Sequence, residues 1–198
     1  MANRVLASLV ILAYKVMYDF SIEGEENIPP EEGVIIAANH RTYADPVILT
    51  MKMKKPVTYM AKEELFRNKL FGAFITALGA FPVKRGAGDM QVIEQCVEKL
   101  GEGKNFVIFP EGTRQKTNKV ARLKTGIAVI AAKSGATVLP MGIIVEGEKL
   151  HFRGKVKLRI GKPIPPEELQ VVEGDRHSIN AAKAKIYDAL KELVETPE

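Results

Sequence analysis

The stretch GVIIAANHRTYADP, residues 33–46, decides how the rest of the chain is interpreted. Its first half is a short apolar run bounded by glycine and polar residues, which predicts a buried strand over 33–39. Asp45 followed by Pro46 predicts an N-cap and the first position of a helix that runs to about Met53. A strand, a polar loop and a helix in succession form the repeating unit of α/β folds.

The same alternation continues along the chain. Short apolar runs predict strands over 56–61, 80–83, 105–109, 137–144 and 156–160. Helical patterns cover 62–67, 69–78, 89–100, 124–134 and 178–194, and Asp89 is the expected cap of the third of these. We therefore expect an α/β fold: residues 20–198 form a single domain with a largely parallel mixed sheet flanked by helices.

The bulk composition agrees with one globular domain. The chain has 198 residues, of which 46% are hydrophobic and 27% charged. Its only cysteine, Cys96, cannot form an internal disulfide and reads as a small buried residue, so a cytosolic setting is the default. A net charge of +5 suits nucleic acid, acidic lipid headgroups or a phosphorylated substrate, and charge alone does not choose among them.

The first 19 residues form an apolar helix in front of this domain. Residues 5–18 are apolar except for Ser8 and Lys15. As a helix at ~1.5 Å per residue they reach about 20 Å, short of the ~30 Å hydrocarbon core, so we expect no complete span. No convincing cleavage site follows Arg4, as a signal peptide would require. Two interpretations stay open: a helix in the membrane interface, or a helix packed on the domain.

Three polar clusters follow predicted strands, at 39–45, 84–85 and 111–114. Because sites in α/β sheets form at the C-terminal ends of strands, we expect these clusters to build one site. Lys84, Arg85 and Arg114 are candidates for anion binding, since an arginine fork pairs with phosphate. The alternative for each is an exposed charge at a strand end.

The first cluster contains the candidate catalytic pair, His40 and Asp45. Histidine is the natural base near neutral pH, and a carboxylate on its other ring nitrogen would hold the tautomer. Asp45 is also expected to cap a helix, but a carboxylate has two oxygens and can do both. We find no G-x-S-x-G elbow, and His40 is too isolated for a zinc site. The nucleophile is therefore expected to come from the substrate, most simply as an alcohol.

Four blocks of the chain together resemble the glycerolipid acyltransferase family, most closely the 1-acylglycerol-3-phosphate acyltransferases. The first is His40-x4-Asp45, flanked by Asn39 and Pro46. The others are GAFPVKR at 79–85, FPEGTR at 109–114 and VLP at 138–140. Their order and spacing fit the family over roughly residues 24–164. The second block departs from the family at Pro82-Val83-Lys84, which leaves the share of Lys84 and Arg85 in phosphate binding open.

This resemblance implies transfer of a fatty acyl group from acyl-CoA or acyl carrier protein to the free hydroxyl of 1-acylglycerol-3-phosphate, giving phosphatidic acid without a cofactor or metal. His40 would be the general base and Asp45 would orient it. The remaining site residues would be Lys84, Arg85, Glu111, Gly112, Thr113 and Arg114 for the phosphate and glycerol, and Pro140 for the acyl-chain region.

The resemblance also places the enzyme in phospholipid biosynthesis at the cytoplasmic face of the cell membrane. It would be peripheral or monotopic, bound to an anionic membrane surface through helix 1–19, with no nucleic-acid partner. Two alternatives are an acyltransferase of the same family with another lysolipid or phosphorylated acceptor, and a non-catalytic basic protein that binds membranes or nucleic acid.

Overall fold

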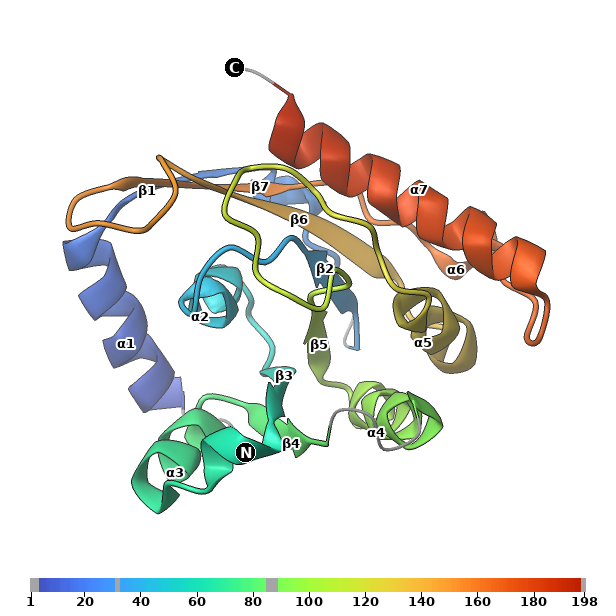
Figure 1. The fold of residues 1–198 in the computed structure, drawn as a ribbon, viewed down its shortest axis with the longest axis horizontal. Helices are drawn as coiled ribbons and strands as arrows, with labels where there is room; N and C mark the ends of the chain where they lie inside the picture. Colours follow the sequence, from blue (N-terminus) through green and yellow to red (C-terminus); the bar gives the residue numbers. More distant parts are fainter. Residues whose placement is uncertain (1–3, 31–32, 85–88, 197–198) are drawn as a thin grey trace.

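The computed structural model describes residues 4–30, 33–84 and 89–196, and a seven-stranded sheet lies at its centre (Figure 1). The strand order is β1-β7-β6-β2-β5-β3-β4. Only the β6–β7 pair is antiparallel, so the expected largely parallel mixed sheet is confirmed. The strands are β1 (Asp19–Glu23), β2 (Ile35–Ala38), β3 (Val57–Lys62), β4 (Ala80–Val83), β5 (Asn105–Ile108), β6 (Val138–Val145) and β7 (Lys155–Ile160).

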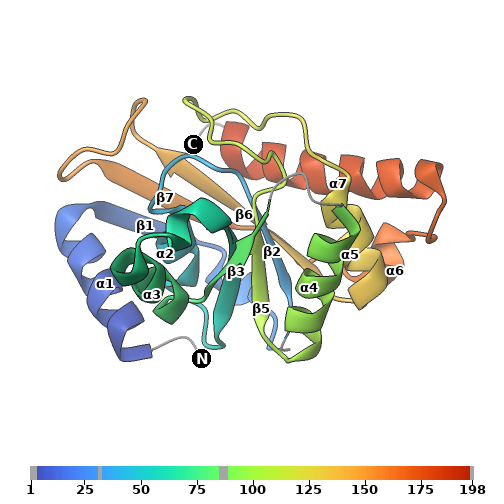
Figure 2. The ribbon, with the colours of Figure 1, turned by 60° about the horizontal axis from the view of Figure 1, so that its bottom comes forward.

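Helices cover both faces of the sheet, as Figures 1 and 2 show. One face carries α1 (Arg4–Met17), α2 (Asp45–Thr50) and α3 (Lys69–Ala77). The other carries α4 (Asp89–Gly101), α5 (Gly126–Ser134), α6 (Pro166–Leu169) and α7 (Arg176–Glu195).

Strand β2 lies in the middle of the sheet with both faces covered. Ile35 and Ala37 pack in the core beneath α4, α5 and α7, while Ile36 and Ala38 pack beneath α1, α2 and α3. All four side chains are fully buried. A strand buried on both faces has no polar alternation, which explains the continuous apolar run at 34–38.

Several boundaries differ from the sequence-based expectation. Three elements were not expected: α6, a 3-10 helix over Glu25–Asn27, and the edge strand β1, where exposed and half-buried residues alternate. The helix expected over 62–67 is a 3-10 turn, Glu63–Phe66, and the helix expected from 124 begins at Gly126. The final helix begins two residues early, at Arg176, because the Asp175 carboxylate accepts from the backbone N–H groups of His177 and Ser178.

Helix α1 packs on the domain along one face, and its proposed position in the membrane interface stays a prediction. Tyr14 packs against the core, and so does Tyr18, the residue that follows the helix. The side chains on the outward face are 59–71% exposed. No helix in the described ranges 4–30, 33–84 and 89–196 combines the length and apolarity that a membrane crossing needs. The exposed residues of this outward face are Val5, Leu9, Leu12 and Val16.

Candidate active site

The loops that follow β2 and β5 meet at one edge of the sheet. These strands pair directly, although 66 residues separate the end of β2 from the start of β5. The backbone N–H of His40 donates to Oε2 of Glu111 at 2.8 Å, and the N–H of Gln115 donates to the carbonyl of His40 at 2.7 Å. The first and third polar clusters are therefore parts of one site, as the sequence predicts.

His40 and Asp45 form the expected pair, with 2.7 Å between Nδ1 and Oδ2. The Asp45 side chain is fully buried, whereas 22% of the His40 side chain is exposed. With Nδ1–H donating to the carboxylate, Nε2 is left as the proton acceptor of the neutral ring. The pair can therefore take a proton from a group that approaches the exposed part of the imidazole.

The carboxylate of Asp45 does not cap α2, which corrects one expectation. Asp45 is the first residue of the helix, and Ala44 stands at the N-cap without a side-chain bond. Oδ2 instead accepts from the backbone N–H groups of Arg41 and Thr42, at 2.6 and 2.8 Å, and Oδ1 accepts from the Thr42 hydroxyl at 2.7 Å. These hydrogen bonds to the Asp45 carboxylate hold the conformation of residues 39–45, which we call the catalytic loop.

A second contact holds the imidazole from its face. The ring of Phe109, directly after β5, stacks on His40 with centroids 4.0 Å apart and an angle of 16° between the planes. Phe109 belongs to the third sequence block, but nothing in the pattern indicated that it would reach His40. Ring stacking and the Asp45 hydrogen bond together restrict how the imidazole can turn.

Glu111 joins three segments of the site. Its two oxygens accept from the backbone N–H groups of His40 and Ala121, each at 2.8 Å. Burial raises the pKa of this carboxyl, and the two backbone hydrogen bonds oppose that shift. The visible role of Glu111 is to tie the loop after β5 to the catalytic loop, and its expected contact with the glycerol stays a prediction.

Arg114 is exposed and lies beside the catalytic loop. Its Cζ sits 3.5 Å from the centroid of the Tyr43 ring, and Tyr43 is 82% exposed. Gly112, two residues earlier, has a φ of 75°, and an added Cβ would come within 2.8 Å of the Lys124 side chain. The turn at 112–114 therefore requires glycine, and it presents Thr113 and Arg114 to solvent at the site.

Arg41 is a site residue that the sequence did not single out. It is buried, and its guanidinium donates to the carbonyls of Gln115 at 3.1 Å and Gly147 at 2.8 Å. Burial lowers its pKa, while the charges of Asp45, Glu111 and Glu148 act in the opposite direction. Arg41 thus fastens the catalytic loop to two neighbouring loops and does not face a substrate.

Lys84 and Pro140 lie apart from this centre. Lys84 follows β4, which β3 separates from β5, so its backbone is about 10 Å from that strand at ~4.8 Å per strand. Lys84 is exposed, and Arg85 lies outside the described residues. Pro140 is buried within β6, and its ring would contact a side chain at Gly161, on the face that packs against Leu193 of α7.

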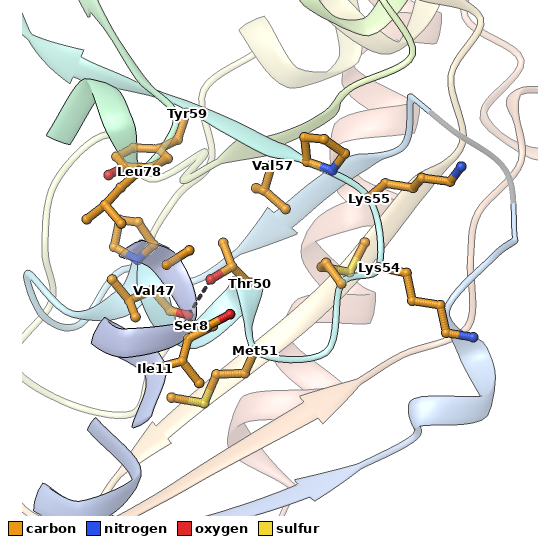
Figure 3. Close-up of a pocket in the computed structure, with 14 residues that line it drawn as sticks. Ser8, Ile11, Val47, Thr50, Met51, Lys54, Lys55, Val57, Tyr59 and Leu78 are labelled. Atoms are coloured by element: carbon orange, nitrogen blue, oxygen red, sulfur yellow. Dashed lines mark hydrogen bonds between the residues drawn. The ribbon is translucent and has the colours of Figure 1, made fainter. Parts of the chain in front are cut away.

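A pocket of about 300 Å³ lies between α1 and α2 (Figure 3). Pro46, next to Asp45, is part of its wall, and Lys54 and Lys55 stand at the opposite end from Tyr59 and Leu78. Its lining is mainly apolar and comes from α1, from α2 and β3 with the connection between them, and from Leu78 after α3. Within the described ranges no three His, Cys, Asp or Glu side chains gather as metal ligands.

Comparison with known proteins identifies the family. Residues 19–144 match the family model described as Acyltransferase, which is more than half of the chain. The chain belongs to the acyltransferase family. This acyltransferase is 36% identical over 146 residues to the 1-acyl-sn-glycerol-3-phosphate acyltransferase of Bacillus subtilis, with 72% of each chain covered. It spans about half the length of the plant and algal relatives that it also matches.

A solved structure supports the same assignment. The acyltransferase superposes on the crystal structure of the 1-acyl-sn-glycerophosphate (LPA) acyltransferase PlsC of Thermotoga maritima with a TM-score of 0.74 and 26% identity. The match covers 98% of this chain and 78% of the other. A further relative, 24% identical over 197 residues, is the lyso-ornithine lipid O-acyltransferase of Pseudomonas aeruginosa, with 86% of this chain and 73% of that one covered.

Proposed function

We propose that the acyltransferase moves a fatty acyl group from an acyl thioester to the free hydroxyl of 1-acylglycerol-3-phosphate, giving phosphatidic acid. The observation that carries this proposal is the His40–Asp45 pair at 2.7 Å, with the exposed Arg114 beside the catalytic loop. A base without an adjacent protein nucleophile suits an attacking alcohol from the substrate. The named activities of the Bacillus and Thermotoga relatives point to the same acceptor.

In the proposed reaction, Nε2 of His40 takes the proton of the glycerol hydroxyl as its oxygen attacks the thioester carbonyl. The new C–O bond gives a tetrahedral intermediate, which collapses with cleavage of the C–S bond. The imidazolium returns its proton to the departing thiolate, so the base is regenerated. Asp45 stabilises the imidazolium through Nδ1–H during this cycle.

Arg114 is the proposed partner of the acceptor phosphate, because a guanidinium fork pairs with two phosphate oxygens. Tyr43 holds it beside the catalytic loop through the ring contact at 3.5 Å. Gly112 and Thr113 lie on the same turn as Arg114, whereas Lys84 and Arg85 stay candidates for the phosphate on the resemblance alone. The acyl chain is proposed to use the apolar pocket between α1 and α2, since Pro46, the neighbour of Asp45 in the sequence, lines that pocket.

The second candidate function is acylation of another lysolipid at the same site. The relative from Pseudomonas favours this alternative, because its name gives a lyso-ornithine lipid as acceptor. A non-catalytic basic binding protein is disfavoured by membership of the acyltransferase family. We also propose that the enzyme works as a peripheral protein at the cytoplasmic face of the membrane, where its lipid acceptor partitions.

One experiment tests the donor and the acceptor together. Acyl-CoA and acyl carrier protein thioesters are each combined with lysophosphatidate, lyso-ornithine lipid and lysophosphatidylcholine, and the ester product is quantified. We expect turnover with lysophosphatidate to exceed that with either other acceptor, and the same reactions with His40→Ala protein correct for background. Higher turnover with a different acceptor replaces the first candidate by the second, and no turnover in any combination contradicts both.

A further inference from the structure

The turn between β6 and β7 presents an aromatic side chain to solvent. Residues 151–154 form this turn, closed by a hydrogen bond of 2.9 Å from the Gly154 N–H to the His151 carbonyl. Phe152 stands at its tip and is 69% exposed. Transfer of an exposed phenylalanine side chain from water to an apolar environment lowers the free energy.

The backbone of this turn is strained. Arg153 has a φ of 60°, in the left-handed region, at the third position of the turn. That position favours glycine or asparagine, and a larger side chain there costs free energy. Strain of this kind persists where the side chains at the turn serve a purpose, and here the arginine places a cation beside Phe152.

The turn is continuous with the outward face of α1. The Arg153 N–H donates to the carbonyl of Met17 at 2.7 Å, and the Asp19 N–H donates to the carbonyl of Gly154 at 3.2 Å. Val16 and Met17, at the end of α1, are 69% and 41% exposed. Figures 1 and 2 both place the β6–β7 loop beside this end of the helix, so the apolar residues of the two elements are neighbours.

The turn belongs to the β6–β7 loop, residues 146–154, which also contacts the catalytic loop. Arg41, next to His40, donates to the carbonyl of Gly147 in this loop. Its charges suit an anionic surface. The exposed cations are Lys15, Lys149, Arg153 and Lys155, against three exposed acids, Asp19, Glu146 and Glu148. The Glu146 carboxylate accepts from the Lys155 N–H, and Glu148 lies near enough to Arg41 to affect its pKa. The net charge of this set is positive.

We propose that the β6–β7 turn is a second membrane contact, in which Phe152 enters the boundary between headgroups and acyl chains of an anionic bilayer beside α1. Two contacts define an orientation, whereas a single helix can roll about its axis. The orientation brings the catalytic loop to the lipid surface, where the acceptor is found. The inference rests on the proposed function only in taking a bilayer lipid as the acceptor.

The chain contains no tryptophan, so a single substitution creates a unique fluorescent probe. We would compare Phe152→Trp with Leu9→Trp on α1 and with Val172→Trp, a control at an equally exposed position between α6 and α7. Each protein is mixed with vesicles of phosphatidylglycerol and phosphatidylcholine, or with acyl carrier protein alone. We expect Phe152→Trp and Leu9→Trp to shift to the blue and to be quenched by lipids brominated on the acyl chain, whereas Val172→Trp should not respond.

A blue shift of Leu9→Trp without one of Phe152→Trp overturns the proposal, because α1 then binds alone. A response of Phe152→Trp to acyl carrier protein but not to vesicles also overturns it, since the turn then docks a protein. As a second variant, Phe152→Ser should weaken vesicle binding roughly tenfold and leave turnover on detergent-dispersed acceptor unchanged. Absent turnover in the unmodified enzyme would contradict the proposed function without affecting the fluorescence result.

Discussion

The imidazole of His40 is hydrogen-bonded to Asp45 through Nδ1, and the ring of Phe109 stacks on one of its faces. We expect His40→Ala to lower turnover by about 10²–10⁴-fold, the usual effect of losing a general base. Because the substitution also removes the contact with Phe109, His40→Gln provides a control of similar size. Steady-state assays and thermal unfolding of both proteins check this. Near-normal turnover in either folded variant would exclude His40 as the base.

Arg114 tests how the acceptor phosphate is recognised. Arg114→Lys keeps the charge but loses the planar fork, so we expect the acceptor KM to rise roughly tenfold while the thioester KM changes little. Tyr43→Ala should raise the acceptor KM about two- to fivefold, since the ring contact contributes ~0.5–1 kcal/mol. Tyr43→Phe keeps the ring and is the matched control. Equal changes in both KM values would place Arg114 outside the phosphate site.

The pH dependence of stability tests Glu111, whose pKa is raised above 4.5 by burial. Between 4.5 and the higher native pKa, the folded state binds more protons than the unfolded state, so this group's contribution to stability falls as pH rises. We expect Glu111→Gln to cost about 1–3 kcal/mol, because one oxygen that accepts a backbone N–H is replaced. The cost of Glu111→Gln should be larger below pH 4.5 than above the native pKa of Glu111.

Urea unfolding of both proteins across about pH 4 to 8 measures this difference. Burial raises the pKa of Tyr59 to about 12, so this side chain does not titrate in this range. A cost that is independent of pH would show that the ionised carboxylate is as stable in the folded protein as in water.

Among the elements, the β6–β7 turn holds a non-glycine residue, Arg153, in the left-handed backbone region, as Gln170 is after α6. Arg153→Gly should relieve a left-handed strain of ~1–2 kcal/mol, less the ~0.5–1 kcal/mol that glycine adds to the unfolded chain's entropy. We expect a melting temperature higher by about 1–4 °C, measured by calorimetry. Arg153→Ala retains the strain and should not show this gain. A lower melting temperature for Arg153→Gly would mean that the arginine side chain stabilises the fold.

For the whole molecule, α1 joins the proposed membrane contact to the core. Deleting residues 2–18 would remove Tyr14, Tyr18 and the wall of the pocket together with the outward face, so paired substitutions are the sharper test. Leu9→Ser with Leu12→Ser should weaken binding to anionic vesicles, since each leucine contributes ~1.5–3 kcal/mol when buried. The remaining binding should be lost more readily in high salt. Unchanged binding in vesicle sedimentation would mean that the outward face does not contact lipid.

Much of the architecture was predictable because its signals are local. The apolar run of β2, the helical spacing in α4 and α7 and the histidine-to-aspartate spacing are all written within short windows. Cys96 was correctly predicted to be buried, and burial raises the pKa of its thiol to about 12. The edge strand β1 was missed, because a five-residue segment that alternates polar and apolar residues beside one partner strand carries a weak signal.

By itself, the sequence determined most of the elements and their order, apart from β1, α6 and the 3-10 helix over Glu25–Asn27, and it indicated the motif residues that build the site. Only the tertiary structure decided which loops meet, because strand order depends on long-range crossovers rather than on local periodicity. It placed β5 beside β2 and left β4 at the edge, so Glu111 reaches His40 and Lys84 lies apart. It also turned the Asp45 carboxylate into the catalytic loop, since that buried charge is satisfied by the backbone donors of Arg41 and Thr42.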